Sequence, residues 1–487
     1  MKSSFVVISR IVSTRRKIWP VLFSGLLLCP SICHAWDPYP QDPLRVMPAL
    51  VAPPLSGGGP CPILTEQTQI DLATAVDQAL CHNPQSQSAW AGIRAQAMQV
   101  GVAESAYLPT ISASIQGVRN RARTTTPQYP RLGTDIANTY HVDTATLNWL
   151  LYDFGSRAAA LDNARLLLQA AQGQYDQALL KIFANTARDY YQAVAAQSAL
   201  AAAVENEQTA QQTLKAASGR VAGGVSAITD QLQAQTAYTQ AMISRIKAEG
   251  EQHNALGVLA LDMGLPVNQL RKVVALQSTA ANLDQVGEAV SVLLGEAQRE
   301  HPTLKAARLQ RDAARARVDQ VRAEGRPSIN LVARASHNTQ PESLGVGLST
   351  TPARSQDRYL GIELNVPIFE GFGRTYKIRN AEAEVDLQEA RLADAEQQVA
   401  RDVWTSHEAL RTSGLNVAAT AELLRHAEAA FTASQKRYRT GVADIMELMN
   451  VQTALATARQ QRIQSIADWH TAKYQLASAL GKLTPVN

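Results

Sequence analysis

The residues that could make or break bonds in this chain are scattered, and none falls in a catalytic pattern. The nine histidines include no pair with metal-ligand spacing, and no serine or cysteine lies in a nucleophile elbow. The Gly-Val-Gly run at 345–347 lacks the third glycine and following helix of a phosphate-binding loop. His82 and His301 lie two residues and one residue before a proline at an expected helix start, which is typical of turn residues. The sequence therefore predicts no enzyme, no metal site and no cofactor.

The N-terminus has the pattern of a secretory signal peptide. A basic start precedes an apolar stretch at 18–28, and Cys33 and Ala35 place small residues where a signal peptidase cleaves. A retained membrane anchor is the alternative, although the stretch is short and contains Pro20. The sequence therefore predicts a signal peptide over 1–35 and an exported protein.

Two cysteines would remain after this signal is removed. Cys61 lies in a segment rich in Pro and Gly, 36–69, which we expect to be an extended leader, and Cys81 follows it. In an oxidising compartment this pair predicts a Cys61–Cys81 disulfide, and the alternative is two free, buried thiols.

Composition indicates long helices and no nucleic-acid partner. The formal net charge is only +4, so neither nucleic acid nor an acidic polymer is expected to bind. Hydrophobic residues make up 46% of the chain but aromatics only 5%, which favours helices packed through small side chains. Beyond the signal no stretch has the roughly 20 apolar residues of a spanning helix, so a membrane-embedded part would have to consist of strands.

The chain contains an internal duplication. Arg220 with Gly224-Val225 returns as Arg437 with Gly441-Val442, a shift of 217 residues (437 − 220). Further landmarks keep this register to within one residue: Asn83-Pro84 and His301-Pro302, Leu147-Asn148 and Leu364-Asn365, Gln235-Thr236-Ala237 and Gln452-Thr453-Ala454, and Gly264 and Gly481. The sequence therefore predicts two repeats, 70–285 and 286–487.

Each repeat is expected to contain a first helix, two strands and a long helical hairpin. In the strands apolar residues such as Ile111, Ala113 and Ile115 alternate with polar ones, which predicts one apolar and one polar face. The expected first helices span 72–107 and 289–325, and polar loops at 120–139 and 338–357 join the strands.

The long helices are predicted over 156–219 and 374–440. At 1.5 Å per residue each would extend on the order of 100 Å. Apolar residues recur every seven positions, for example at Ile378, Val385 and Val399, which indicates coiled-coil packing. Glycine turns, at Gly223-Gly224 and at Gly441, would reverse each long helix into a hairpin.

Four strands cannot close into a barrel, and open edges in lipid would leave backbone groups unpaired at several kcal/mol each. Several copies would therefore have to pool their strands around a polar lumen, with the helices forming a periplasmic tube. The predicted fold class is α+β: an outer-membrane β-barrel, four strands per subunit, continuous with a long α-helical coiled-coil barrel. A soluble four-stranded domain is the alternative.

These features resemble the TolC family of outer-membrane factors, which serve efflux pumps and type I secretion systems. The resemblance covers nearly all of the chain from Ile70 onward and is carried by Asn83-Pro84, 149–157, 366–374 and Leu480-Gly481. It implies a homotrimer with a twelve-stranded barrel in outer-membrane lipid and a twelve-helix periplasmic tunnel. It also implies docking to a periplasmic adaptor and to an inner-membrane transporter, either ABC-type or proton-driven.

The resemblance implies a periplasmic gate at the hairpin tips, 220–230 and 437–450. Two acids three positions apart in the family correspond to Glu447 and Asn450, so one carboxylate is retained. Facing glutamates of three copies would raise each other's pKa and attract cations, and the alternative is a solvated helix face. The duplication places Asp230 opposite Glu447 (447 − 217 = 230), so each tip carries one acid.

The resemblance also suggests how a closed gate is held. Tyr438 and Asp230 match family residues that can form a hydrogen bond, which would contribute about 1 kcal/mol. The family's tip arginine falls on Ala443, so a salt-bridge latch loses its match, and Arg437 or Arg439 would have to replace it.

Aromatic residues cluster where the strands meet the helices. Interfacial anchoring in the membrane is one interpretation, and filling of the narrow junction is the other. The residues are Trp149, Tyr152, Phe154, Phe369 and Phe372.

The predicted function is an outer-membrane exit duct for an exported substrate. The cysteine pair and the proline-rich leader favour type I secretion of a protein such as a toxin, and multidrug efflux is the alternative. A periplasmic adaptor is more remote, because adaptors usually carry one hairpin flanked by β-modules, whereas this chain has two hairpins.

Overall fold

The computed structural model describes residues 70–267, 272–274, 290–343 and 350–483. The predicted signal peptide and leader, 1–69, lie outside the described residues, as does Cys61.

The two repeats contain the same helices with the same lengths. The first repeat has α2 (Leu72–His82), α3 (Pro84–Ser105), α4 (Ser156–Ala222) and α5 (Ile228–Asp262). The second has α6 (Val290–Glu300), α7 (Pro302–Ala323), α8 (Gly373–Arg439) and α9 (Ile445–Ala479). Both α4 and α8 contain 67 residues, and both α5 and α9 contain 35, so the predicted duplication is confirmed at the level of whole elements.

The single first helix predicted for each repeat is wrong, because a proline divides it. Asn83 and His301 have extended backbone before the proline, as steric clash with the proline ring requires. Each side chain caps the next helix: Asn83 Oδ1 accepts from the Gln85 amide at 2.8 Å, and His301 Nδ1 from the Thr303 amide at 3.2 Å. His301 is thus the turn residue expected from the sequence, whereas His82 is the last residue of α2.

Gly264 and Gly481 recur because the end of each hairpin lies against this proline break. A Cβ on Gly264 would come within 2.9 Å of the His82 carbonyl oxygen, and one on Gly481 within 3.0 Å of Pro302 Cδ. Both glycines also have positive φ, so no other residue fits without strain.

The strands β1 (Thr110–Thr124), β2 (Thr134–Tyr152), β3 (Ser328–Asn338) and β6 (Ser355–Asn365) form an antiparallel sheet in the order β1-β2-β3-β6. A 3₁₀ turn, η2 (Pro130–Leu132), precedes β2, and β4 (Glu342–Ser343) pairs with β5 (Thr350–Thr351). The register aligns apolar residues across all four strands on one face, as Ile111, Leu147, Ala333 and Leu360. The next row is polar, with Ser112, Thr146, Arg334 and Tyr359, which confirms the two-faced sheet.

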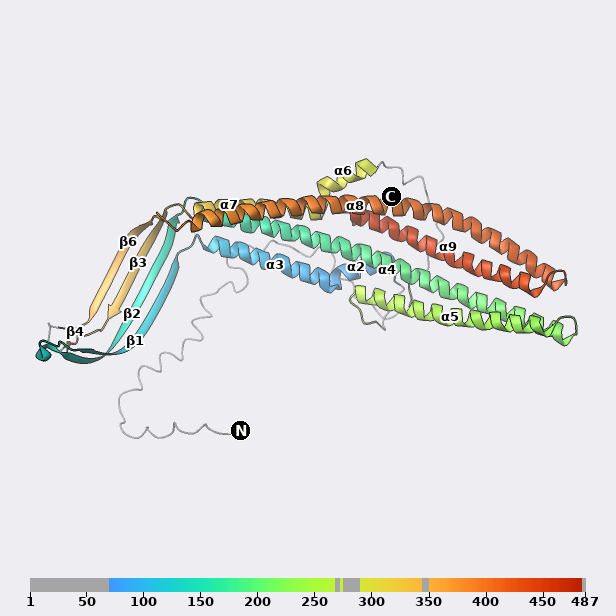
Figure 1. Cartoon of the computed structure of the whole chain (residues 1–487), viewed down its shortest axis with the longest axis horizontal. Coiled ribbons are helices and arrows are strands. Elements are labelled where there is room, and N and C mark those ends of the chain that lie inside the picture. The colour runs from blue at the N-terminus through green and yellow to red at the C-terminus, as the bar shows by residue number, and fades with distance from the viewer. Residues whose placement is uncertain (1–69, 268–271, 275–289, 344–349, 484–487) are drawn as a thin grey trace, which may run out of the picture. The chain divides into compact units, whose positions relative to one another are not determined.

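The helices pack side by side, with α4 against α3, α5, α7 and α9, and α8 against α7 and α9. One core cluster joins Tyr190 of α4, Leu259 of α5 and Ala467 of α9. The heptad residues Ile378 and Val385 pack against α7, as coiled-coil contact predicts. Figure 1 shows the four strands at one end of the long helices and both hairpin turns at the other.

No helix in the described part of the chain is long and apolar enough to cross a membrane.

Candidate gate at the helix-hairpin tips

The first hairpin reverses through a turn that satisfies the end of α4. The amide of Gly224 donates to the Val221 carbonyl at 3.0 Å, and the amide of Val225 donates to the Arg220 carbonyl at 2.9 Å. This is a Schellman motif, in which the residue after the cap adopts a left-handed conformation. Gly224 has φ of 72° and supplies that conformation, while Gly223 is the cap residue itself.

The second hairpin repeats this turn at the end of α8. The amide of Gly441 donates to the Tyr438 carbonyl at 3.1 Å, and the amide of Val442 to the Arg437 carbonyl at 2.9 Å. Gly441 has φ of 81°. Arg220 and Arg437 therefore occupy the same turn position in the two tips, and their side chains can be compared directly.

Arg220 connects the two hairpins. Its Nη1 donates a hydrogen bond of 2.9 Å to the Tyr438 carbonyl, and its guanidinium carbon lies 4.9 Å from the centre of the Tyr438 ring. The ring attracts the cation, and a charged hydrogen bond contributes roughly 1.5–3 kcal/mol. The repeat equivalent of Tyr438 is Val221 (438 − 217 = 221), which offers Arg437 no ring.

Arg437 instead bonds within its own hairpin. Its Nη1 lies 3.0 Å from Glu447 Oε1, and the two side chains are 55% and 36% exposed. At that exposure the ion pair contributes about 0–1 kcal/mol. Asp444 caps α9, because its Oδ1 accepts from the Glu447 amide at 2.7 Å.

Tyr438 is buried in an apolar cluster that joins the two tips. Its side chain is 4% exposed, and its hydroxyl has no hydrogen-bond partner among the described residues. The Tyr438–Asp230 hydrogen bond predicted from the sequence is therefore not formed. Burial raises the pKa of Tyr438, Arg220 lowers it, and the nearby Asp230 carboxylate raises it. The other buried members of the cluster are Ala217, Ala234, Ala443, Ile445 and Leu448.

The two predicted acids occupy equivalent places. Asp230 lies in the first turn of α5 and Glu447 in the first turn of α9. Within the described chain Asp230 forms no ion pair, whereas Glu447 is paired. Asn450 is exposed, one turn further along α9. Ala443, at the family's arginine position, packs in the cluster between the tips.

Sequence reasoning missed Arg220 as a contact residue. It identified Arg220 only as a landmark of the duplication, and the arginines considered for a latch were both on α8. The sequence did contain a signal: the residue that follows Arg220 is Val221, whereas the residue that follows Arg437 is Tyr438. The two equivalent arginines therefore have different neighbours.

The junction between strands and helices is held by a second pair of equivalent arginines. Arg157 Nε lies 3.2 Å from Asp153 Oδ2, and its Nη1 donates to the Leu150 carbonyl at 2.6 Å. Arg374 Nε lies 3.0 Å from Glu370 Oε2, and its Nη2 donates to the Glu324 carbonyl at 3.1 Å. In both repeats the carboxylate precedes the arginine by four residues, a signal already present in the sequence.

These ion pairs stabilise a strained turn. Phe154 and Phe372, which precede the long helices, have positive φ of 53° and 64°. Phe369 and Phe372 are 74% and 68% exposed, and their rings pack edge to face with 5.6 Å between the ring centres. Trp149 Nε1 donates to the Tyr107 carbonyl at 2.9 Å, and the rings of Tyr152 and Phe154 meet edge to face with 4.7 Å between their centres.

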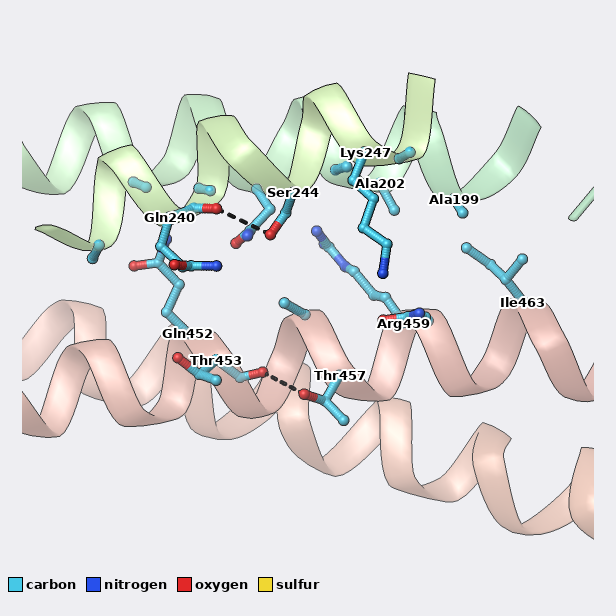
Figure 2. Close-up of a pocket in the computed structure, with 18 of the residues that line it drawn as sticks. Ala199, Ala202, Gln240, Ser244, Lys247, Gln452, Thr453, Thr457, Arg459 and Ile463 are labelled. Atoms are coloured by element: carbon cyan, nitrogen blue, oxygen red, sulfur yellow. Dashed lines mark hydrogen bonds between the residues drawn. The ribbon is translucent and has the colours of Figure 1, made fainter. Parts of the chain in front are cut away.

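A groove of about 400 Å³ lies between the hairpins, lined mainly by alanine and glutamine. Figure 2 shows Gln240, Ser244 and Lys247 of α5 on one side and Thr453 and Arg459 of α9 on the other.

Cys81 lies on α2 and is disulfide-bonded. Its expected partner, Cys61, is outside the described residues, so the pairing itself stays a prediction.

A duplicated chain with a two-faced sheet at one end of two long hairpins has the architecture of an outer-membrane export channel. The family model for outer membrane efflux proteins matches residues 75–264 and 293–482, once in each repeat, so the chain belongs to that family.

Relatives and solved structures agree with this membership. Protein CyaE of Bordetella pertussis is 32% identical over 448 residues, 91% of each chain. Outer membrane protein TolC of Vibrio cholerae is 24% identical and covers 85% of this chain and 91% of its own. The CmeC outer membrane channel of Campylobacter jejuni superposes with a TM-score of 0.72 at 16% identity, covering 85% of this chain and 86% of that one. The TolC-family resemblance and the outer-membrane location are thereby confirmed.

Proposed function

We propose that this protein is the outer-membrane exit duct of a type I protein secretion system and acts as a homotrimer without enzymatic activity. The observation that carries the proposal is the sheet, whose apolar and polar faces are continuous with two long hairpins. Its edge strands, β1 and β6, run in opposite directions. One copy's β6 beside the next copy's β1 would therefore continue the antiparallel order and satisfy both edges.

The polar face would line the lumen of such a closed barrel. It carries small uncharged residues on β1 and β2, which give an exported chain few apolar surfaces to bind. The residues include Ser112, Ser114, Thr144, Thr146 and Asn148.

The helical end would meet the rest of the export system. A groove lined by small side chains admits a helix at close range, and the groove in Figure 2 has that character. We assign it to a helical hairpin of a periplasmic adaptor, which would link the duct to an ABC transporter of the inner membrane.

Protein cargo is favoured over drugs by the bonded Cys81 and the proline-rich leader, which together lead us to a dedicated exporter. The chain is also more similar in sequence to Protein CyaE, at 32% identity, than to TolC of Vibrio cholerae, at 24% identity. Multidrug efflux is the second candidate, because the family itself is named for efflux.

A deletion strain separates the two candidates. We expect the deletion to abolish release of a secreted protein into the medium and to leave drug sensitivity unchanged, and the gene supplied in trans should restore the release. Increased drug sensitivity with normal protein release would establish efflux instead. Cell fractionation should be done first. We expect a heat-resistant trimer in the outer membrane, and recovery of a soluble periplasmic protein would exclude both the secretion duct and the efflux channel.

At the tips we propose a gate that the Arg220–Tyr438 contact holds closed. The two acids, Asp230 and Glu447, would form two rings of carboxylates around the mouth in a trimer and favour cations. Single-channel recording in planar bilayers tests this part separately from cargo.

A further inference from the structure

The apolar face of β1 changes character along the strand. Side chains alternate between faces, so Ile111, Ala113 and Ile115 share a face with Arg119, Arg121 and Arg123. We call these three arginines the arginine ladder. All three side chains are exposed, and they lie on the part of β1 far from the helices.

The charges around the ladder are unbalanced. Arg121 pairs with Asp135 of β2 at 2.9 Å, with 75% of the arginine side chain exposed. Within the described residues Arg119 and Arg123 form no ion pair. The remaining charged or titratable groups on this face, read from the register, are His141, Asp143, His337 and Arg358.

The opposite face offers an internal comparison. Its described strand residues are mostly neutral, and Arg334 of β3 is placed among Thr146 and Tyr359. Basic residues at every second position are therefore found on the same face of the sheet as the apolar residues, and not on the polar face.

This placement identifies a ligand. The apolar part of the face contacts acyl chains in the outer membrane, and the helices extend into the periplasm. The ladder begins four residues beyond Ile115, roughly 14 Å further along the strand at 3.4 Å per residue. That is where acyl chains give way to head groups on the external side.

We infer that the arginine ladder binds phosphate groups of the glycolipid in the outer leaflet. Guanidinium groups bind phosphate through paired charge-assisted hydrogen bonds, and anionic head groups attract basic residues at a membrane surface. Arg119 and Arg123 supply the free guanidinium groups, while Arg121 also remains tied to Asp135. The inference rests on the outer-membrane location and not on the nature of the cargo.

The test uses the full-length protein in detergent, incubated with bisphosphorylated lipid A and analysed by native mass spectrometry. Arg119→Gln/Arg123→Gln leaves the Arg121–Asp135 pair intact, and Arg334→Gln is the matched control on the other face. We expect the double variant to retain roughly tenfold less lipid A, with the wild type and R334Q alike. Dephosphorylated lipid A should bind all three proteins equally weakly.

Three results would overturn the inference: equal retention by the double variant, equal retention of dephosphorylated lipid A by the wild type, or an equal loss in R334Q. Heat-resistant assembly, measured on the same samples, identifies a variant that has failed to fold. In that case Arg119→Lys/Arg123→Lys, which keeps the charge, should restore both assembly and retention, and failure to restore retention in an assembled protein also overturns it.

Discussion

The two hairpin tips share one backbone design and differ in how their side chains are connected. Both end in the same glycine turn, with Arg220 and Arg437 at the same position. Arg220 reaches the other hairpin, whereas Arg437 reaches Glu447 in its own. The turn is the same in both repeats because its left-handed backbone conformation favours glycine. The side-chain contacts differ, because a change in one neighbouring residue is enough to give the equivalent arginines different partners.

The caps show the same divergence. The N-cap residue of α9 is Asp444, whose carboxylate caps the helix, whereas the N-cap residue of α5 is Ala227, which provides no side-chain cap. The start of α5 therefore lacks a stabilising hydrogen bond that the start of α9 has.

Removal of Arg220 should have the largest effect. Arg220→Ala loses the charged hydrogen bond, of roughly 1.5–3 kcal/mol, and the ring contact as well, so the open population should rise about tenfold or more. Single-channel conductance in planar bilayers measures this. Arg437→Ala is the matched control and should change conductance little, because its ion pair is largely exposed. Equal opening in both variants would remove the distinction between the tips.

The fold could be predicted from the sequence because its determinants are local. Alternation at Ile111 to Ile115 specifies a two-faced strand, the spacing of Ile378 and Val385 a coiled coil, and Gly441 a turn. The repeat then predicted the helices and the pair of long strands twice. The division of the first helix was missed, although Pro84 and Pro302 were visible, because the helical pattern continued on both sides of each proline.

The gate could be predicted only as a region. The positions of Asp230 and Glu447 follow from the repeat, but contacts between hairpins depend on the relative rotation of four helices, which no local pattern encodes. Tyr438 illustrates this point: family resemblance suggested a hydroxyl bonded to Asp230, whereas the ring packs under Arg220 with its hydroxyl enclosed.

Ion selectivity should distinguish the two acids. Glu447 is neutralised in part by Arg437, while Asp230 has no cationic partner among the residues described. Asp230→Asn should therefore reduce the preference for potassium over chloride more than Glu447→Gln does, by a factor of about two or three. Reversal potentials in a salt gradient measure the preference. A greater loss in E447Q would mean that the Arg437 pair is broken in the conducting protein.

The difference in caps predicts a smaller, local effect. Asp444→Ala should destabilise the first turn of α9 by about 1 kcal/mol, because a Ser, Thr, Asp or Asn cap contributes that much. Amide hydrogen exchange at 445–450 should quicken roughly fivefold. The reciprocal change, Ala227→Asp, should protect the start of α5, and no change there would show that its turn cannot place a capping carboxylate.

Tyr438→Phe should have the smallest effect, and its sign decides between the two views of the latch. If the hydroxyl held the gate through Asp230, its removal would open the channel. In the structure the hydroxyl is buried without a partner, and an unpaired buried polar group costs roughly 1–3 kcal/mol. Phenylalanine keeps the ring for Arg220 and the backbone carbonyl that Arg220 binds, so the closed conductance should be unchanged or slightly lower.

Tyr438→Leu, which removes the ring, should open the channel part of the way toward Arg220→Ala. An opening in Y438F as large as in Y438L would show that the hydroxyl, and not the ring, joins the two tips.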